Sequence, residues 1–157
     1  MENKVYIETS IVSYYTACPS REPIVAAYQE ITHEIWPVLQ KRYDLYISAL
    51  AIQEVYRGDQ KAAEKRLGVL SAISVLEISQ DAQNIADRLI DDNAIPSEYG
   101  EGALHVAIAS INGMDLLFTG NFSHINTISI KTKIVESIEN QGYRPPAICS
   151  PDELPGD

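Results

Sequence analysis

The sequence predicts an α/β fold of three layers, in which helices cover both faces of a mostly parallel sheet of four or five strands. Short β-branched and aromatic segments alternate with one or two helical segments, an order that favours parallel strands joined by helical crossovers. Residues 115–119 are apolar without alternation, as in a strand covered on both faces. Pro and Gly are scattered and no repeat interrupts the sequence, so we expect a single domain over residues 1–157.

The first half of the chain begins with a strand and continues with helices around a second strand. Residues 4–8 predict the first strand because they are rich in β-branched and aromatic side chains. Apolar residues spaced three and four apart predict a helix over 24–39. A buried second strand is expected at 45–47, followed by a short helix at 49–57 that Gly58 closes. One further helical stripe consists of Ala63, Leu67 and Leu70.

The second half continues the alternation of strands and helices. A third strand is expected at 74–78, and Ser79 then offers an N-cap to an amphipathic helix. Residues 103–111 predict a helix that is apolar nearly all round and therefore buried. The fourth strand comes next, and a last helix at 131–140 leads to a fifth strand at 147–149.

Composition and charge limit the classes of function. No apolar run approaches the roughly 20 residues that span a bilayer, and the start lacks the basic and apolar regions of an export signal. We therefore expect a cytoplasmic protein without a membrane partner, in which Cys18 and Cys149 stay reduced. The formal net charge of −10 disfavours strong binding to nucleic acid, unless divalent cations carry positive charge into an acidic site.

Polar side chains follow three of the predicted strands. Glu8, Thr9 and Ser10 follow the first, Glu54 lies on the helix after the second, and Asn121 follows the fourth. Ligands of parallel sheets bind outside the carboxyl ends of the strands. Two carboxylates and a carboxamide meeting there form an oxygen-rich site suited to Mg²⁺ or Mn²⁺. The chain has 22 acidic residues, so each carboxylate alone also fits a solvated surface.

Four segments resemble the motifs of PIN domains, in the order in which that family carries them. Residues 5–14 resemble the opening motif, in which a strand delivers an acid followed by Thr-Ser. Residues 48–54 resemble the second motif, 102–109 the third, and 113–125 the fourth. The match runs over residues 4–149 and is similar to the VapC-type toxins of bacterial toxin–antitoxin pairs.

This resemblance implies an endoribonuclease that depends on Mg²⁺ or Mn²⁺, forms a homodimer and is held inactive by a small antitoxin. By the same resemblance, Glu8 and Glu54 match the first two acids of a catalytic quartet. Thr9 and Ser10 match hydroxyls that orient the first acid or a bound water, and Asn121 takes the fourth place.

The third place departs from the family pattern, because Gly102 stands where an acid is expected before Ala-Leu-His. Glu101 is turned by roughly 100° on a helix from that position, and Glu98 lies about one turn earlier. Gly100 and Gly102 each lower helix stability by ~1 kcal/mol against Ala and so predict a frayed start. Compensation by Glu98 or Glu101 and a loss of activity both stay open.

Two alternatives to an active ribonuclease also stay open. One is a PIN-like module with weakened chemistry that binds RNA or an antitoxin. The other is a small α/β regulatory or nucleotide-binding domain, which would bind its ligand at the same edge without a divalent metal.

The histidines and two further charged residues have simple structural explanations. We expect His105 to be a hydrogen-bonded core histidine or to orient a neighbouring acid, and Arg57 to pair with Glu54. Asp115, at the start of its strand, should lie at the opposite edge of the sheet. The spacing of His33, His105 and His124 matches no zinc signature.

Overall fold

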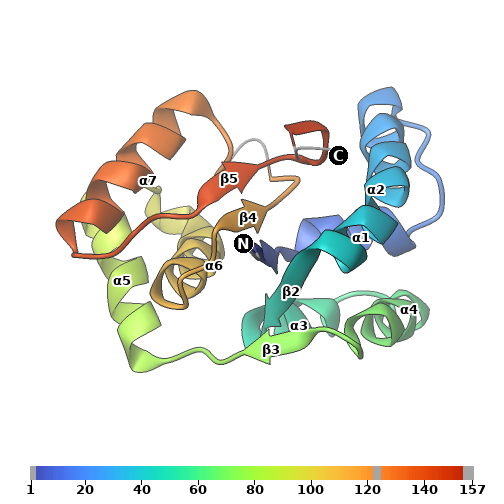
Figure 1. Cartoon of the computed structure of the whole chain (residues 1–157), viewed down its shortest axis with the longest axis horizontal. Helices are drawn as coiled ribbons and strands as arrows, with labels where there is room; N and C mark the ends of the chain where they lie inside the picture. Colours follow the sequence, from blue (N-terminus) through green and yellow to red (C-terminus); the bar gives the residue numbers. More distant parts are fainter. Residues whose placement is uncertain (1–2, 122–124, 154–157) are drawn as a thin grey trace.

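A parallel sheet with helices on both faces organises the chain (Figure 1). The structure is a computed structural model that describes residues 3–121 and 125–153. Within these residues the sheet has five strands, all parallel, in the order β3-β2-β1-β4-β5. Their bounds are β1 Asn3–Ile7, β2 Tyr43–Ser48, β3 Ser74–Leu76, β4 Leu116–Phe118 and β5 Ala147–Cys149. The predicted three-layer fold with a mostly parallel sheet is confirmed.

The helices divide between the two faces of the sheet (Figure 1). One face is covered by α1 Thr9–Thr16, α2 Pro23–Arg42, α3 Ala49–Val55 and α4 Gln60–Leu70. The other is covered by α5 Gln80–Asp91, α6 Gly100–Ile111 and α7 Ile128–Asn140. Side chains of β1 alternate between the two faces of the sheet. Val5 and Ile7 join the core on the α1–α4 side, and Tyr6 joins the core on the α5–α7 side.

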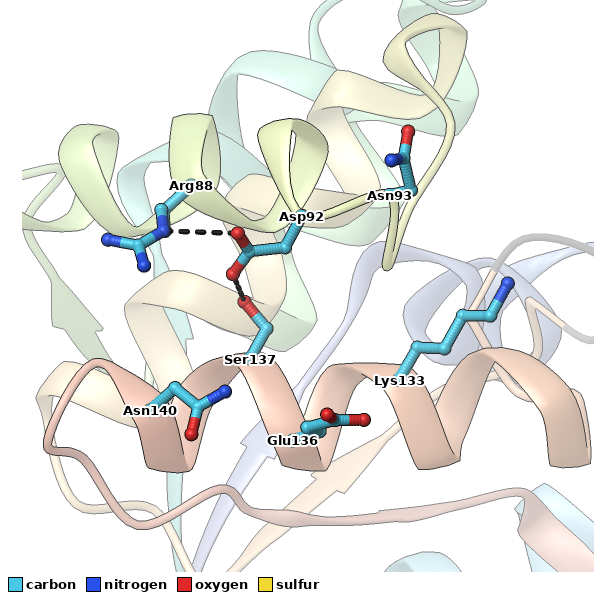
Figure 2. A pocket seen from close by; sticks show the side chains of 7 residues that line it. All are labelled: Arg88, Asp92, Asn93, Lys133, Glu136, Ser137 and Asn140. Atoms are coloured by element: carbon cyan, nitrogen blue, oxygen red, sulfur yellow. Dashed lines mark hydrogen bonds and ion pairs between the residues drawn. The ribbon is translucent and has the colours of Figure 1, made fainter.

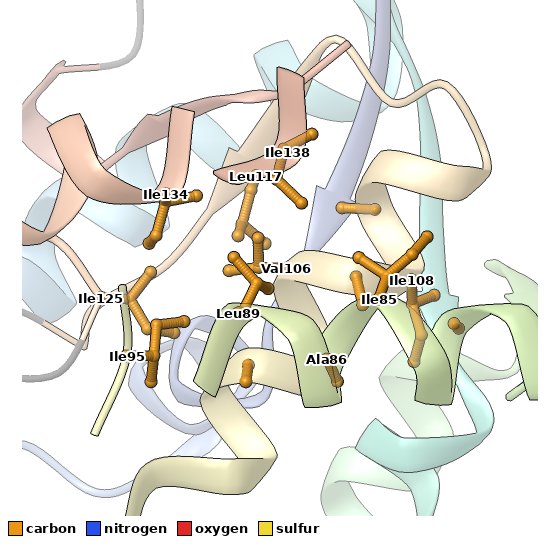
Figure 3. Close-up of a cluster of buried hydrophobic side chains, with 14 of the residues drawn as sticks. Ile85, Ala86, Leu89, Ile95, Val106, Ile108, Leu117, Ile125, Ile134 and Ile138 are labelled. Atoms are coloured by element: carbon orange, nitrogen blue, oxygen red, sulfur yellow. The ribbon is translucent and has the colours of Figure 1, made fainter. Parts of the chain in front are cut away.

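The core on the α5–α7 side is built almost entirely from aliphatic side chains (Figure 3). Leu89 of α5, Val106 of α6 and Ile138 of α7 meet above Leu117 of β4 and are buried. Ile125 also belongs to this core and is fully buried. This packing holds α6 against the sheet, and the start of α6 lies at the carboxyl end of the strands.

Side-chain caps explain where several helices begin. Ser79 accepts a hydrogen bond from the Ala82 amide at 3.1 Å, as expected for the N-cap of α5. Thr127 accepts from the Ile130 amide at 3.2 Å, so α7 begins before the predicted residue 131. The N-cap of α3 is Ser48, which accepts from the Ala51 amide at 3.3 Å.

The helix predicted over 24–39 is confirmed as α2, and its apolar positions are buried unevenly: Leu39 is buried and Ile35 packs against the core, whereas Ile24 is 65% exposed. One local prediction was wrong. The start of α6 is not frayed, because the helix includes Gly100 and continues from the turn η1 Ser97–Tyr99. Burial of the α6 side chains against α5 and the sheet offsets the low helix propensity of its glycines.

The opposite edge of the sheet has a structural role. Asp115 precedes β4 and accepts hydrogen bonds from the Lys4 amide at 2.8 Å and from Arg144 at 3.0 Å, as its position predicts. Cys18 and Cys149 are free thiols. Among the residues that the structure describes, no helix is both long and apolar enough to cross a bilayer.

Candidate active site

One pocket of about 550 Å³ lies at the carboxyl end of β1 and β4 and receives the side chains predicted to converge there. Glu8 directly follows β1, and its amide donates to the Phe118 carbonyl at 3.0 Å, which extends the pairing of β1 with β4. Glu54 reaches the pocket from α3, the helix after β2. Asn121 enters from the loop after β4. The structure therefore brings Glu8, Glu54 and Asn121 together.

Glu8 is buried and is held through one carboxylate oxygen. Its Oε1 accepts hydrogen bonds from the Ser10 hydroxyl and, at 2.7 Å, from the Thr119 hydroxyl. The Gly120 amide in turn donates to Ser10 Oγ at 2.7 Å. Among the described residues no donor reaches Glu8 Oε2, so the second oxygen remains available to a ligand in the pocket.

Glu54 is held in the same way. Its Oε1 accepts from Thr9 Oγ1 at 2.5 Å and contacts His105 Nε2 at 2.7 Å, whereas no described residue donates to its Oε2. Burial raises the pKa of Glu54, but the hydrogen bonds from His105 and Thr9 and the charge of Arg57 outweigh it. The net pKa lies below the ordinary value, so Glu54 is a carboxylate at neutral pH.

The ligand atoms of Glu8, Glu54 and His105 lie within 4.8 Å of one another. Two carboxylates at this separation repel each other, and a divalent cation between them removes that repulsion. Carboxylate oxygens are also the ligands that Mg²⁺ and Mn²⁺ prefer. The residues present therefore fit a hard divalent cation.

The backbone of Asn121 is held by Thr119, because the Asn121 amide donates to Thr119 Oγ1 at 2.9 Å. The Thr119 hydroxyl thus links Asn121 to Glu8. The remaining residues of the fourth motif, Phe122, Ser123 and His124, lie outside the described residues.

The third place of the motif is occupied by Gly102, which lines the pocket without offering a ligand. Glu101 forms an ion pair with Arg57, whose Nη1 lies 2.6 Å from Oε2. The predicted pair of Arg57 with Glu54 is therefore wrong, because the side chain of Arg57 reaches α6 instead. Glu98 and Glu101 both line the pocket, but neither belongs to the group of close ligand atoms.

The contact between His105 and Glu54 agrees with both interpretations of this histidine, since His105 is buried and also bonded to an acid. Thr119 and Tyr6 also contribute, as the partners of Glu8 and His105 respectively. Thr119 carried a signal, being the last residue of the predicted fourth strand. Tyr6 carried none, because a strand tyrosine is expected simply to pack.

Gly120 is required beside the site. A Cβ at this position would lie 2.4 Å from Cε2 of Tyr14, whose hydroxyl donates to the Gly120 carbonyl at 3.3 Å. We expect Gly120→Ala to displace the Tyr14 ring and to lower the free energy of unfolding by about 1–3 kcal/mol, as overpacking does. Urea unfolding measures the effect. In a Tyr14→Ala background the same substitution should have a clearly smaller effect, and an equal loss in both backgrounds would contradict this explanation.

A second hollow of about 400 Å³ lies between α5 and α7 (Figure 2). Its central group, Asp92, accepts from Ser137 at 2.7 Å and pairs with Arg88 at 3.1 Å (Figure 2). The Asp92–Ser137 hydrogen bond joins the two helices. We assign this hollow a structural role.

No protein-family model matches the sequence, and no curated protein sequence matches it. A chain of VapBC2 from Rickettsia felis, solved with a DNA fragment from its promoter, superposes with a TM-score of 0.61. The superposition covers 93% of this chain and 97% of that chain at 14% identity. The chain has the PIN-type fold of VapC toxins.

A second VapC structure supports the same fold. VapC20 of Mycobacterium tuberculosis, a toxin that cleaves the sarcin-ricin loop, superposes with a TM-score of 0.56 at 13% identity. It covers 79% of this chain and 98% of its own. At identities this low, the superpositions show the VapC-type fold alone.

Proposed function

We propose that the chain is a metal-dependent endoribonuclease of VapC type, acting as one domain over residues 1–157 in the cytoplasm. The observation that carries this proposal is the arrangement of Glu8 and Glu54. Each is anchored through Oε1 by two hydrogen bonds, and each leaves Oε2 without a donor among the described residues. Carboxylates that only packed in the core or paired with Lys or Arg side chains would not need one anchored and one open oxygen each.

Glu8 and Glu54 would hold Mg²⁺ or Mn²⁺, which lowers the pKa of a bound water and offsets negative charge on the phosphate. Ser10 and Thr9 fix the two carboxylates through their hydroxyls, which spares the site reorganisation when charge develops. Asn121 lines the same pocket, where its carboxamide can hydrogen-bond a water without adding negative charge.

RNA is the proposed substrate, by analogy with VapC20 and its cleavage of the sarcin-ricin loop. We also propose a small antitoxin partner, by analogy with the VapBC2 complex, and a homodimer, which the resemblance of the sequence motifs to VapC-type toxins implies. The net charge of −10 supports weak, selective contact with RNA, or a partner that supplies basic residues.

The direct test is cleavage of a structured RNA hairpin by protein stripped of metal and then supplied with Mn²⁺ or Mg²⁺. We expect cleavage at an internal position only when the ion is present. A Glu54→Gln protein purified in parallel measures contaminating nuclease. Equal cleavage by both proteins, or cleavage unaffected by chelator, would remove the proposal.

A second candidate function rests on one observation: among the described residues, no third carboxylate joins Glu8 and Glu54 in the group of close ligand atoms. Gly102 offers no ligand and Glu101 is taken by Arg57, so the chain would then be a weakened PIN-like module that binds RNA or an antitoxin. This candidate predicts RNA binding that survives chelation, with no cleavage in Mn²⁺. A gel-shift assay in EDTA, run beside the cleavage assay, separates the two candidates.

A further inference from the structure

A buried chain of three side chains, Ser48, Tyr6 and His105, leads from the core to Glu54, and of the three only His105 lines the pocket. Ser48 Oγ lies 2.6 Å from the Tyr6 hydroxyl, which lies 2.6 Å from His105 Nδ1. His105 Nε2 completes the chain at 2.7 Å from Glu54 Oε1. Ser48 and Tyr6 are fully buried and His105 is 2% exposed. Buried polar groups of this kind must satisfy one another.

The positions of the protons follow from the partners. The Glu54 carboxylate can only accept, so His105 Nε2 carries a hydrogen and donates it. In the neutral imidazole Nδ1 is then an acceptor and takes the Tyr6 hydroxyl hydrogen. Tyr6 oxygen in turn accepts from Ser48, and Ser48 Oγ accepts from the Ala51 amide. Every hydrogen in this direction has an acceptor.

The opposite direction leaves a group unsatisfied. If His105 Nδ1 donated to Tyr6, the Tyr6 hydrogen would point to Ser48, and the Ser48 hydrogen would have no acceptor among the described residues. The direction in which Ser48 donates to Tyr6 and Tyr6 donates to His105 is therefore the one that the geometry supports.

We propose that Ser48 and Tyr6 fix His105 as a hydrogen-bond donor to Glu54, so that His105 is a positioning residue and not a metal ligand. The inference rests on the proposed function, because it takes Glu54 as a ligand of the ion. A ring nitrogen of His105 lies close enough to both carboxylates to be taken for a third ligand, but Nε2 carries the hydrogen donated to Glu54 and Nδ1 accepts from Tyr6, so neither nitrogen has a free lone pair for a metal. The ion is left with carboxylate ligands, and its affinity depends on a tyrosine hydroxyl in the core.

The test compares Tyr6→Phe with Tyr46→Phe, since Tyr46 pairs with Tyr6 across β1 and β2. Mn²⁺ affinity is measured by calorimetry. We expect Tyr6→Phe to weaken Mn²⁺ binding by ~10–100-fold, the usual effect of removing support behind a metal ligand, and Tyr46→Phe to leave it unchanged. Equal affinity in the wild type and Tyr6→Phe would overturn the inference.

Substitution of His105 tests the donor directly and stands even if Tyr6→Phe fails to fold. Glutamine can place an amide N–H where His105 Nε2 lies, so His105→Gln should keep most of the Mn²⁺ affinity. His105→Leu, which has no donor, should lose ~10–100-fold. Equal losses in the two variants would show that only the shape of the ring matters and would overturn the inference.

Pulsed EPR of bound Mn²⁺ distinguishes a positioning residue from a ligand. We expect no nitrogen modulation of the kind given by a coordinated imidazole, and its detection would overturn the inference while leaving the ribonuclease proposal intact. A wild-type protein that binds no Mn²⁺ at all would instead remove the proposed function, and this inference with it.

Discussion

Glu8→Gln is expected to abolish metal-dependent RNA cleavage. The substitution keeps the size of the side chain, and its carbonyl oxygen still accepts from Ser10 and Thr119. It removes one of the two carboxylates in the group of close ligand atoms. Since losing mere support of a ligand weakens metal binding or activity by ~10–100-fold, we expect losses of at least about 100-fold in Mn²⁺ affinity and in cleavage rate.

The stability of Glu8→Gln should change in the other direction. A neutral side chain beside Glu54 removes a like-charge repulsion, so the free energy of unfolding without metal should not fall. Glu64→Gln is a matched control, because Glu64 is exposed on α4 and the change in net charge is the same. An affinity for Mn²⁺ that is equal in both variants would contradict the assignment of Glu8.

Gly102→Asp is expected to strengthen the site. The new carboxylate would project from α6 into the pocket that holds Glu8 and Glu54. Its Cβ would lie 3.3 Å from Cγ1 of Ile125, so the isoleucine side chain has to shift slightly. We expect Mn²⁺ affinity to rise by ~10–100-fold, with faster RNA cleavage, as measured by calorimetry and a cleavage assay.

Two variants separate the added ligand from other effects. Gly102→Asn has nearly the same size without the charge, and Gly100→Asp adds the same charge two residues earlier, where a Cβ meets nothing within 4 Å. In Gly102→Asp, Mn²⁺ should also raise the free energy of unfolding more than it does in the wild type, since the ion would bind the folded variant more tightly. If Gly102→Asp binds Mn²⁺ no better than Gly102→Asn, position 102 is not a ligand place in this chain.

Much of the fold could be predicted because its signals are local. Ser79 marks the start of α5 and caps it as expected. The apolar residues of 115–119 identified a strand buried between two layers, and β4 lies within them. Where the prediction failed, packing decided: α6 keeps two glycines in its first turn because its side chains are buried in the core.

The sequence by itself determined which side chains reach the candidate site. Glu8, Glu54 and Asn121 follow strands, and parallel strands end at one edge, so topology alone brings them together. Only the tertiary structure decided the partners of these side chains. Arg57 pairs with Glu101 and not with Glu54, and His105 joins Glu54 to Tyr6. Such contacts depend on rotamers and on distances between elements far apart in sequence, which periodicity and spacing do not encode.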